Sequence, residues 1–195
     1  MGRPALYDAP TLVHAAQQLA AAGGPGSVTI AAVAMATGAP VGSIYHRFGS
    51  RDSLMAAAWL DALAEFQAGF IATLHRSAPQ PALAAALFTT SWARSDATRA
   101  RLLVLHRARD YGAGSWGDAD RARARLLSDD LEAALAAFCL QQLGGTGGEQ
   151  RRLATFALLD LPYAAVRRYL AAGITPPAEV DGYLATAVSG LLPHG

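Results

Sequence analysis

The sequence predicts an all-α protein of about nine helices. Of its 195 residues, 45 are Ala and 26 are Leu, which are among the strongest helix formers. Apolar residues recur at helical spacing along nearly the whole chain, whereas no strand-like alternation of five or more residues stands out. Because 52% of the residues are hydrophobic, we expect the chain to be folded around a substantial core.

Capping side chains mark the first two helices. Asp8 is expected to cap the first helix, which carries Pro10 in its first turn and ends at the glycine-rich break of residues 23–26. Either Ser27 or Thr29 then opens a second, short helix, since both side chains can accept a hydrogen bond from the first turn.

Glycine and proline delimit the next two helices. The second helix stops near Gly38, and a third of barely two turns runs from Pro40 to about Gly49. Ser50 caps a long fourth helix, whose large apolar residues form one stripe that reaches Leu74.

Proline pairs and glycine runs divide the rest of the chain. Residues 111–117 are Gly-rich and are expected to form a loop, and Pro162 is expected to remove a backbone hydrogen bond and bend the helix that contains it. The remaining expected helices cover residues 82–93, 96–110, 118–143, 149–172 and a last stretch from Pro177 to about Leu192.

Composition excludes several classes of function. All 16 basic residues are Arg, so the chain has neither a phosphate-binding GxxxxGK[ST] loop nor a Schiff-base lysine. Cys139 is the single cysteine, and no Cys/His cluster has metal-ligand spacing. We therefore expect no metal, no cofactor and no enzymatic activity. The net charge of +1 gives no overall field for nucleic acid, so a DNA site must be local.

The N-terminus predicts a cytoplasmic protein. Polar residues, among them Asp8 and His14, interrupt any apolar run that could serve as a signal peptide. No stretch of 18 or more uninterrupted apolar residues is present, so we expect no interaction with a membrane.

Residues 28–54 carry the most informative pattern. Two short helices meet at Gly38, which permits the positive φ of a sharp helix-turn-helix corner. Apolar side chains are expected to lock the two helices together, and no acidic residue stands between Asp8 and Asp52. The gap keeps carboxylates away from an approaching phosphate backbone.

Residues 28–54 resemble the DNA-binding domain of the TetR family of bacterial transcriptional repressors. The resemblance rests on Gly38, on Gly42-Ser43-Ile44-Tyr45, on Phe48 and on the run from Ser50 to Leu54. It implies a helix-turn-helix domain over residues 1–50 and a regulatory, ligand-binding and dimerisation domain over residues 51–195. The residues that it implies for contact with double-stranded operator DNA are Thr29, Pro40, Val41, Gly42, Ser43, Tyr45, His46, Arg47 and Arg51.

Within that set, Tyr45, His46 and Arg51 are expected at phosphates, and residues 40–43 at base edges. The chain departs from the family pattern at Pro40, which offers no capping side chain, and at Val41, which suits a thymine methyl group. The segment Gly2-Arg3-Pro4 either lays an arginine in the minor groove or is a disordered tail.

Aromatic residues of the second domain are candidates for a ligand site. An aromatic cavity with few polar groups suits a largely apolar small molecule. For each residue taken singly, packing in the core is the alternative. The candidate residues are Trp59, Leu63, Phe66, Phe70, Trp92, His106, Tyr111, Trp116 and Phe138.

The last two helices offer an apolar face for a homodimer built as a four-helix bundle, with intramolecular packing as the alternative. The residues of this face are Leu158, Leu161, Tyr163, Val166, Leu170, Val180, Leu184, Val188, Leu191 and Leu192.

Together these features predict a homodimeric repressor that a small, largely apolar effector releases from a palindromic operator. Two alternatives remain open at this point. One is a helical small-molecule-binding protein with a vestigial helix-turn-helix, and the other is a DNA-binding regulator controlled by a protein partner.

Overall fold

The computed structural model describes residues 7–75 and 80–192, and every regular element among them is helical. The all-α prediction is therefore confirmed. The α-helices are α1 (Ala9–Gly23), α2 (Ile30–Thr37), α3 (Val41–Phe48), α4 (Arg51–Leu74), α5 (Pro81–Ser95), α6 (Ala97–Leu105), α7 (Asp118–Leu143), α8 (Gly148–Thr155), α9 (Leu161–Ala171) and α10 (Glu179–Leu191). Short turns complete the set: η1 (Pro25–Ser27), η2 (Ala108–Tyr111), η3 (Ala113–Ser115) and η4 (Phe156–Asp160).

The expected caps form at the start of α1, α2 and α4. The Asp8 carboxylate accepts the Thr11 N–H over 2.9 Å, and the Ser50 hydroxyl accepts the Ser53 N–H over 3.1 Å. Thr29, rather than Ser27, caps α2 by accepting the Ala32 N–H over 3.0 Å. These side chains satisfy backbone donors that a helix leaves free at its N-terminus.

The sixth helix is shorter than expected. It ends at Leu105, and His106 is extended, with φ −125° and ψ 178°. The Asp110 carboxylate accepts the Arg107 N–H over 2.8 Å and opens the separate turn η2. That turn buries Tyr111 against Trp59, with ring centroids 4.8 Å apart, so tertiary packing ends the helix.

Pro162 disturbs its helix as expected, although the disturbance takes a specific form. Between α8 and α9 the chain makes the π-helical turn η4, in which the Leu161 N–H donates to Phe156 O, five residues back. Pro162 follows this turn directly, at the second residue of α9, and the backbone stays helical through Asp160 and Leu161.

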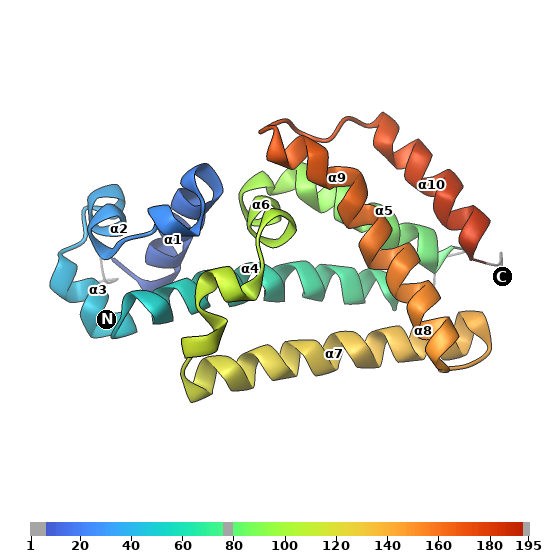
Figure 1. Ribbon diagram of the computed structural model, residues 1–195, viewed down its shortest axis with the longest axis horizontal. Coiled ribbons are helices and arrows are strands. Elements are labelled where there is room, and N and C mark those ends of the chain that lie inside the picture. The colour runs from blue at the N-terminus through green and yellow to red at the C-terminus, as the bar shows by residue number, and fades with distance from the viewer. Residues whose placement is uncertain (1–6, 76–79, 193–195) are drawn as a thin grey trace, which may run out of the picture.

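The helices form a small head and a larger body joined by α4 (Figure 1). The head consists of α1, α2 and α3 around the N-terminal end of α4, and α4 continues into the body beside α5 and α7. By length and composition alone α4 could cross a membrane, but 56% of its most apolar window is buried inside the molecule. It is the core helix of the described structure.

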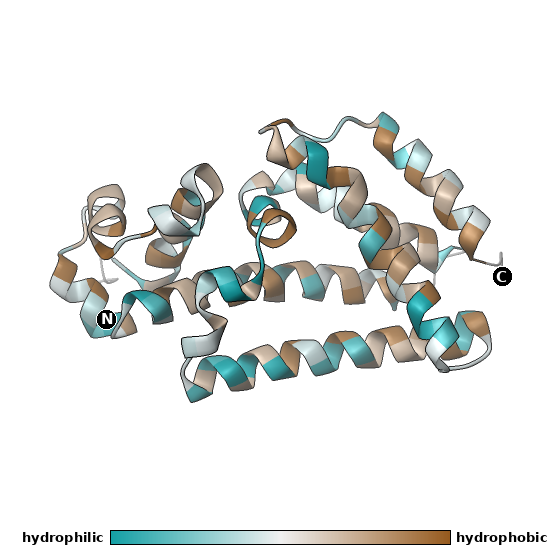
Figure 2. Ribbon diagram, in the orientation of Figure 1, coloured by the Kyte–Doolittle hydropathy of each residue, from teal (hydrophilic) through white to brown (hydrophobic). Residues whose placement is uncertain are grey.

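Helix α7 is the most solvent-facing of the long helices. Hydrophilic and hydrophobic residues alternate along it (Figure 2), and its buried residues are Ala134, Phe138 and Cys139. It runs alongside α4 and packs against α4 and α8. Half-buried leucines of α7, among them Leu127, Leu131 and Leu135, add to its packing against the core.

Most apolar residues of the face predicted for dimer contact are buried inside the chain. Both α9 and α10 pack against α5, so their strongest apolar stripe serves the core of the same chain. An apolar stripe does not specify whether its partner is intramolecular or a second copy. The buried residues of the expected face are Leu158, Val166, Leu170, Val180, Leu184, Val188 and Leu192.

Candidate nucleic-acid interface

The turn between α2 and α3 has the geometry of a helix-turn-helix corner. Gly38 ends α2 in the left-handed region, at φ 72° and ψ 9°, where a Cβ would be strained. Val33 and Ile44, one on each helix, are fully buried, and Ala39 beside them is also buried. These contacts fix α3 against α2 and direct its other face outward.

The outward face of α3 carries most of the predicted DNA-binding residues. Val41 is 46% exposed and Tyr45 is 50% exposed, while Ser43 is half-buried. A Cβ built on Gly42 would meet nothing within 4 Å, so packing inside this chain does not require a glycine there. A glycine on an open helix surface permits close approach of another molecule. The other exposed members of the set are Thr29, Pro40, His46 and Arg47.

The start of α3 presents backbone donors. Pro40 provides no side-chain cap, as expected, and its carbonyl accepts the Ser43 N–H over 2.9 Å. The N–H groups that precede that bond lie in the first turn, where a helix favours anions and hydrogen-bond acceptors. Val41 and Gly42 therefore lie at a weakly electropositive end of the helix.

Arg47 lies close enough to Asp8 to affect its ionisation. The pKa of Asp8 is lowered, chiefly by hydrogen bonds from Thr11 and in smaller part by the Arg47 charge. Asp8 is thus the carboxylate that borders this face on the α1 side, and Asp52 is the next one along the chain.

Arg51 has a structural role alongside the predicted one. Its Nε donates to Val28 O over 2.5 Å and its Nη2 donates to Pro25 O over 2.9 Å. The side chain therefore fastens the connection between α1 and α2 to the start of α4. Its Nη1 lies 3.7 Å from the Asp52 carboxylate, so a phosphate at Arg51 would compete with that ion pair.

The predicted ligand residues form packed clusters of rings. Phe66 contacts Phe70, Phe88, Trp92 and Tyr163, with centroid distances between 4.9 and 5.8 Å. Trp59 packs on Tyr111 in a second cluster, and the pKa of Tyr111 is raised by burial.

Most members of these clusters are inside the core. Leu63 and His106 are half-buried, and burial lowers the pKa of His106, which favours its neutral form. Core packing, the alternative for each residue, is what their surroundings show. The buried members of the predicted set are Trp59, Phe66, Phe70, Trp92, Tyr111, Trp116 and Phe138.

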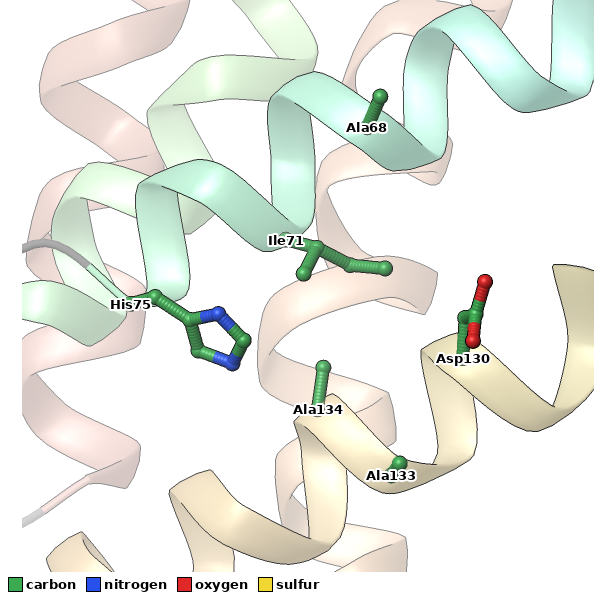
Figure 3. Close-up of a pocket in the computed structure, with 6 residues that line it drawn as sticks. All are labelled: Ala68, Ile71, His75, Asp130, Ala133 and Ala134. Atoms are coloured by element: carbon green, nitrogen blue, oxygen red, sulfur yellow. The ribbon is translucent and has the colours of Figure 1, made fainter.

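A cleft of about 470 Å³ lies instead between α4 and α7. Figure 3 shows Ile71 of α4 pointing across the cleft toward α7, with His75 directly after the end of α4 and Asp130 on α7. The remaining lining residues are Ala68, Ala133 and Ala134. Sequence reasoning missed this cleft, because alanines at helical spacing are equally typical of a close helix contact.

The comparisons agree with this geometry. Residues 12–58 match the family described as bacterial regulatory proteins, tetR family. The matched residues include most of α1, all of α2 and α3, and the start of α4. The predicted resemblance to the TetR family is confirmed. No curated protein sequence matches the chain.

Solved structures share the fold over nearly the full length. The transcriptional regulator FadR from Bacillus subtilis, in complex with stearoyl-CoA, has a TM-score of 0.70 at 13% identity, over 96% of this chain and 100% of that chain. PfmR, a TetR-family regulator from Thermus thermophilus, has a TM-score of 0.65 at 19% identity, over 93% and 96%. A TetR-family member from Streptomyces coelicolor has a TM-score of 0.64 at 19% identity, over 94% and 97%.

Proposed function

We propose that this chain, which carries the DNA-binding domain and the fold of TetR-family transcriptional regulators, is a cytoplasmic homodimeric repressor released from a palindromic operator by a small effector. The observation that carries the proposal is the outward face of α3. On this face Gly42 has no packing role within the chain and Tyr45 is half exposed. In the sequence, no acidic residue lies between Asp8 and Asp52.

The DNA-binding domain is residues 1–50 in this proposal, and α3 enters the major groove. Residues 40–43 face base edges at the start of the helix. Tyr45, His46 and Arg47 reach phosphates, together with the Thr29 hydroxyl at the start of α2. The N-terminal arm considered above, Gly2-Arg3-Pro4, lies outside the described residues.

Residues 51–195 form the regulatory domain, and α9 with α10 holds the dimer. The outer sides of these helices border a groove of about 280 Å³, and Tyr183 at its edge is 71% exposed. A second copy would cover this groove around a two-fold axis. Two heads would then reach successive major grooves about 34 Å apart. The groove is lined by Leu161, Ala164, Ala165, Arg168, Val180, Tyr183, Leu184 and Ala187.

The effector occupies the cleft between α4 and α7 in this proposal. Ile71 and the alanines suit an apolar body, while Asp130 and His75 can bind a hydrogen-bond donor or a cationic group. A ligand there would push α7 away from α4 or draw it closer, and α4 carries the head. To lower the operator affinity a hundredfold, the effector must bind the arrangement of the heads that does not fit DNA about 2.8 kcal/mol more tightly than the arrangement that does.

Selection of binding sites from random duplex DNA tests the proposal. The full chain should enrich a palindrome whose half-sites are about one helical turn apart. Compounds can then be screened for release of that DNA. Failure to enrich any sequence, with no salt-sensitive retention of DNA, would contradict DNA binding and favour a helical small-molecule-binding protein.

A further inference from the structure

One arginine in the body connects the head directly to the proposed dimer helices. Arg101 lies on α6, which stands between α1 and α9 (Figure 1) and packs against both. Its Nε donates to Ala21 O in the last turn of α1 over 2.9 Å. Its Nη1 donates to Leu170 O in the last turn of α9 over 2.7 Å.

Both carbonyl groups belong to helix ends that attract a cation. The residue four positions after Ala21 is Pro25, which has no N–H to donate, so Arg101 supplies the donor that the helix lacks. Leu170 O also accepts the Gly173 N–H over 3.1 Å at the end of α9. The partial negative charge at a helix C-terminus adds an electrostatic attraction at each end.

The guanidinium group is suited to this position. Its planar fork donates in two fixed directions from one side chain, whereas an ammonium is a point charge on a flexible stem. A single rigid group therefore touches α1 and α9 at once, and α6 is held between them.

A second polar contact keeps α6 against the head. The Asp61 carboxylate of α4 accepts Gln17 Nε2 of α1 over 2.9 Å and Arg99 Nη2 of α6 over 3.0 Å. Gln17 is fully buried and also donates to Ala58 O over 3.1 Å. The head is thus attached to α4 and α6, but only Arg101 among these residues reaches a dimer helix.

We propose that Arg101 is a positioning residue that fixes the orientation of each DNA-binding head relative to α9, and so sets the half-site spacing that the dimer accepts. This inference rests on the proposed function. Without Arg101, the head is held by α4 and by the Asp61 contacts with Gln17 and Arg99, none of which reaches α9, so its orientation relative to α9 is less restricted. Attachment through Arg101 adds that restriction and raises the effective concentration of one head once the other is bound.

The test compares Arg101→Met with Arg167→Met in the full-length chain. Arg167 of α9 donates to Val104 O of α6, so it ties α6 to α9 without touching the head. Each variant is titrated against the selected palindrome, against a single half-site, and against palindromes with base pairs added or removed between half-sites. Light scattering and a thermal melt establish that each variant is a folded dimer.

Arg101→Met is expected to bind the palindrome about tenfold more weakly or worse, to bind the half-site unchanged, and to lose its preference for one spacing. Arg167→Met is expected to keep that preference. An equal loss of affinity for the palindrome and the half-site would overturn the inference. So would loss of the spacing preference in both variants. If the wild-type chain enriches no palindrome, the proposed function fails first, and the two failures are thereby distinguished.

A distance measurement tests the same claim without DNA. Met35 on α2 is 85% exposed, so Met35→Cys accepts a spin label, while the native Cys139 is fully buried. Double electron–electron resonance spectroscopy should give a narrow distribution of distances between the labels on the two heads of the dimer. Adding Arg101→Met should broaden that distribution. If Arg101→Met does not fold, Arg101→Lys, which keeps the charge but loses the fork, replaces it in both experiments. An unchanged distribution and spacing preference in the folded variant would contradict a positioning role.

Discussion

Replacing Tyr45 with Phe should weaken operator binding strongly while leaving the fold intact. Tyr45 is 50% exposed on the outer face of α3, and its hydroxyl makes no hydrogen bond to any of the described residues. The substitution keeps the ring and removes only a donor to phosphate. A hydrogen bond to a charged group contributes about 1.5 kcal/mol at the lower end. Two heads therefore lose about 3 kcal/mol, which is more than a hundredfold in Kd.

Fluorescence anisotropy with labelled operator measures this loss. Since a phenol hydroxyl carries no charge, the slope of log K against log salt should stay unchanged, whereas Arg47→Met should make the slope shallower by about one for each head. Met35→Leu, another exposed position of the head, is the matched control and should bind like the wild type. A Tyr45→Phe variant that binds within twofold of the wild type would refute the assignment of α3 as the DNA-reading helix.

Three further predictions concern stability and the effector. Phe66→Ala removes a ring that is 2% exposed, so chemical denaturation should show a loss of about 3 to 5 kcal/mol, and a loss below about 1 kcal/mol would mean that the cluster is loosely packed. For Asp181, burial raises the pKa, but hydrogen bonds from Arg94 and Thr90 outweigh it, so the folded pKa lies below the usual 3.8. The resulting stabilisation is present above that value and is lost as pH falls through the folded pKa, so Asp181→Asn should weaken the acid dependence of the melting temperature. Asp130→Asn should weaken release by a cationic effector and leave the effector-free operator affinity unchanged, and equal sensitivity to that effector would exclude Asp130 from the site.

Local chemistry made the head predictable from the sequence. Caps such as Asp8 and Ser50 act within three residues, and a positive φ at Gly38 follows from the absence of a Cβ. The order of apolar and polar positions on α3 then determines which side faces outward, since Ile44 must be buried. Each of these features depends on neighbours close in the chain.

The body was less predictable because its features depend on distant partners. The stripe through Phe66 indicates a buried face, but not whether rings or a ligand fill the space beside it. The inward packing of Leu184 depends on α5, far away in sequence. Arg101 carries no sequence signal at all, because an arginine in a short helix is usually solvated, and its two acceptors come from residues 21 and 170.

The most direct test of the central claim is the stoichiometry of the complex with selected DNA. Two chains should bind one palindromic duplex, a duplex with one half-site should bind far more weakly, and protection of the DNA should fall in two successive major grooves. One chain bound per palindrome, or protection confined to the phosphate backbone with no sequence preference, would contradict a homodimer that reads its operator through α3.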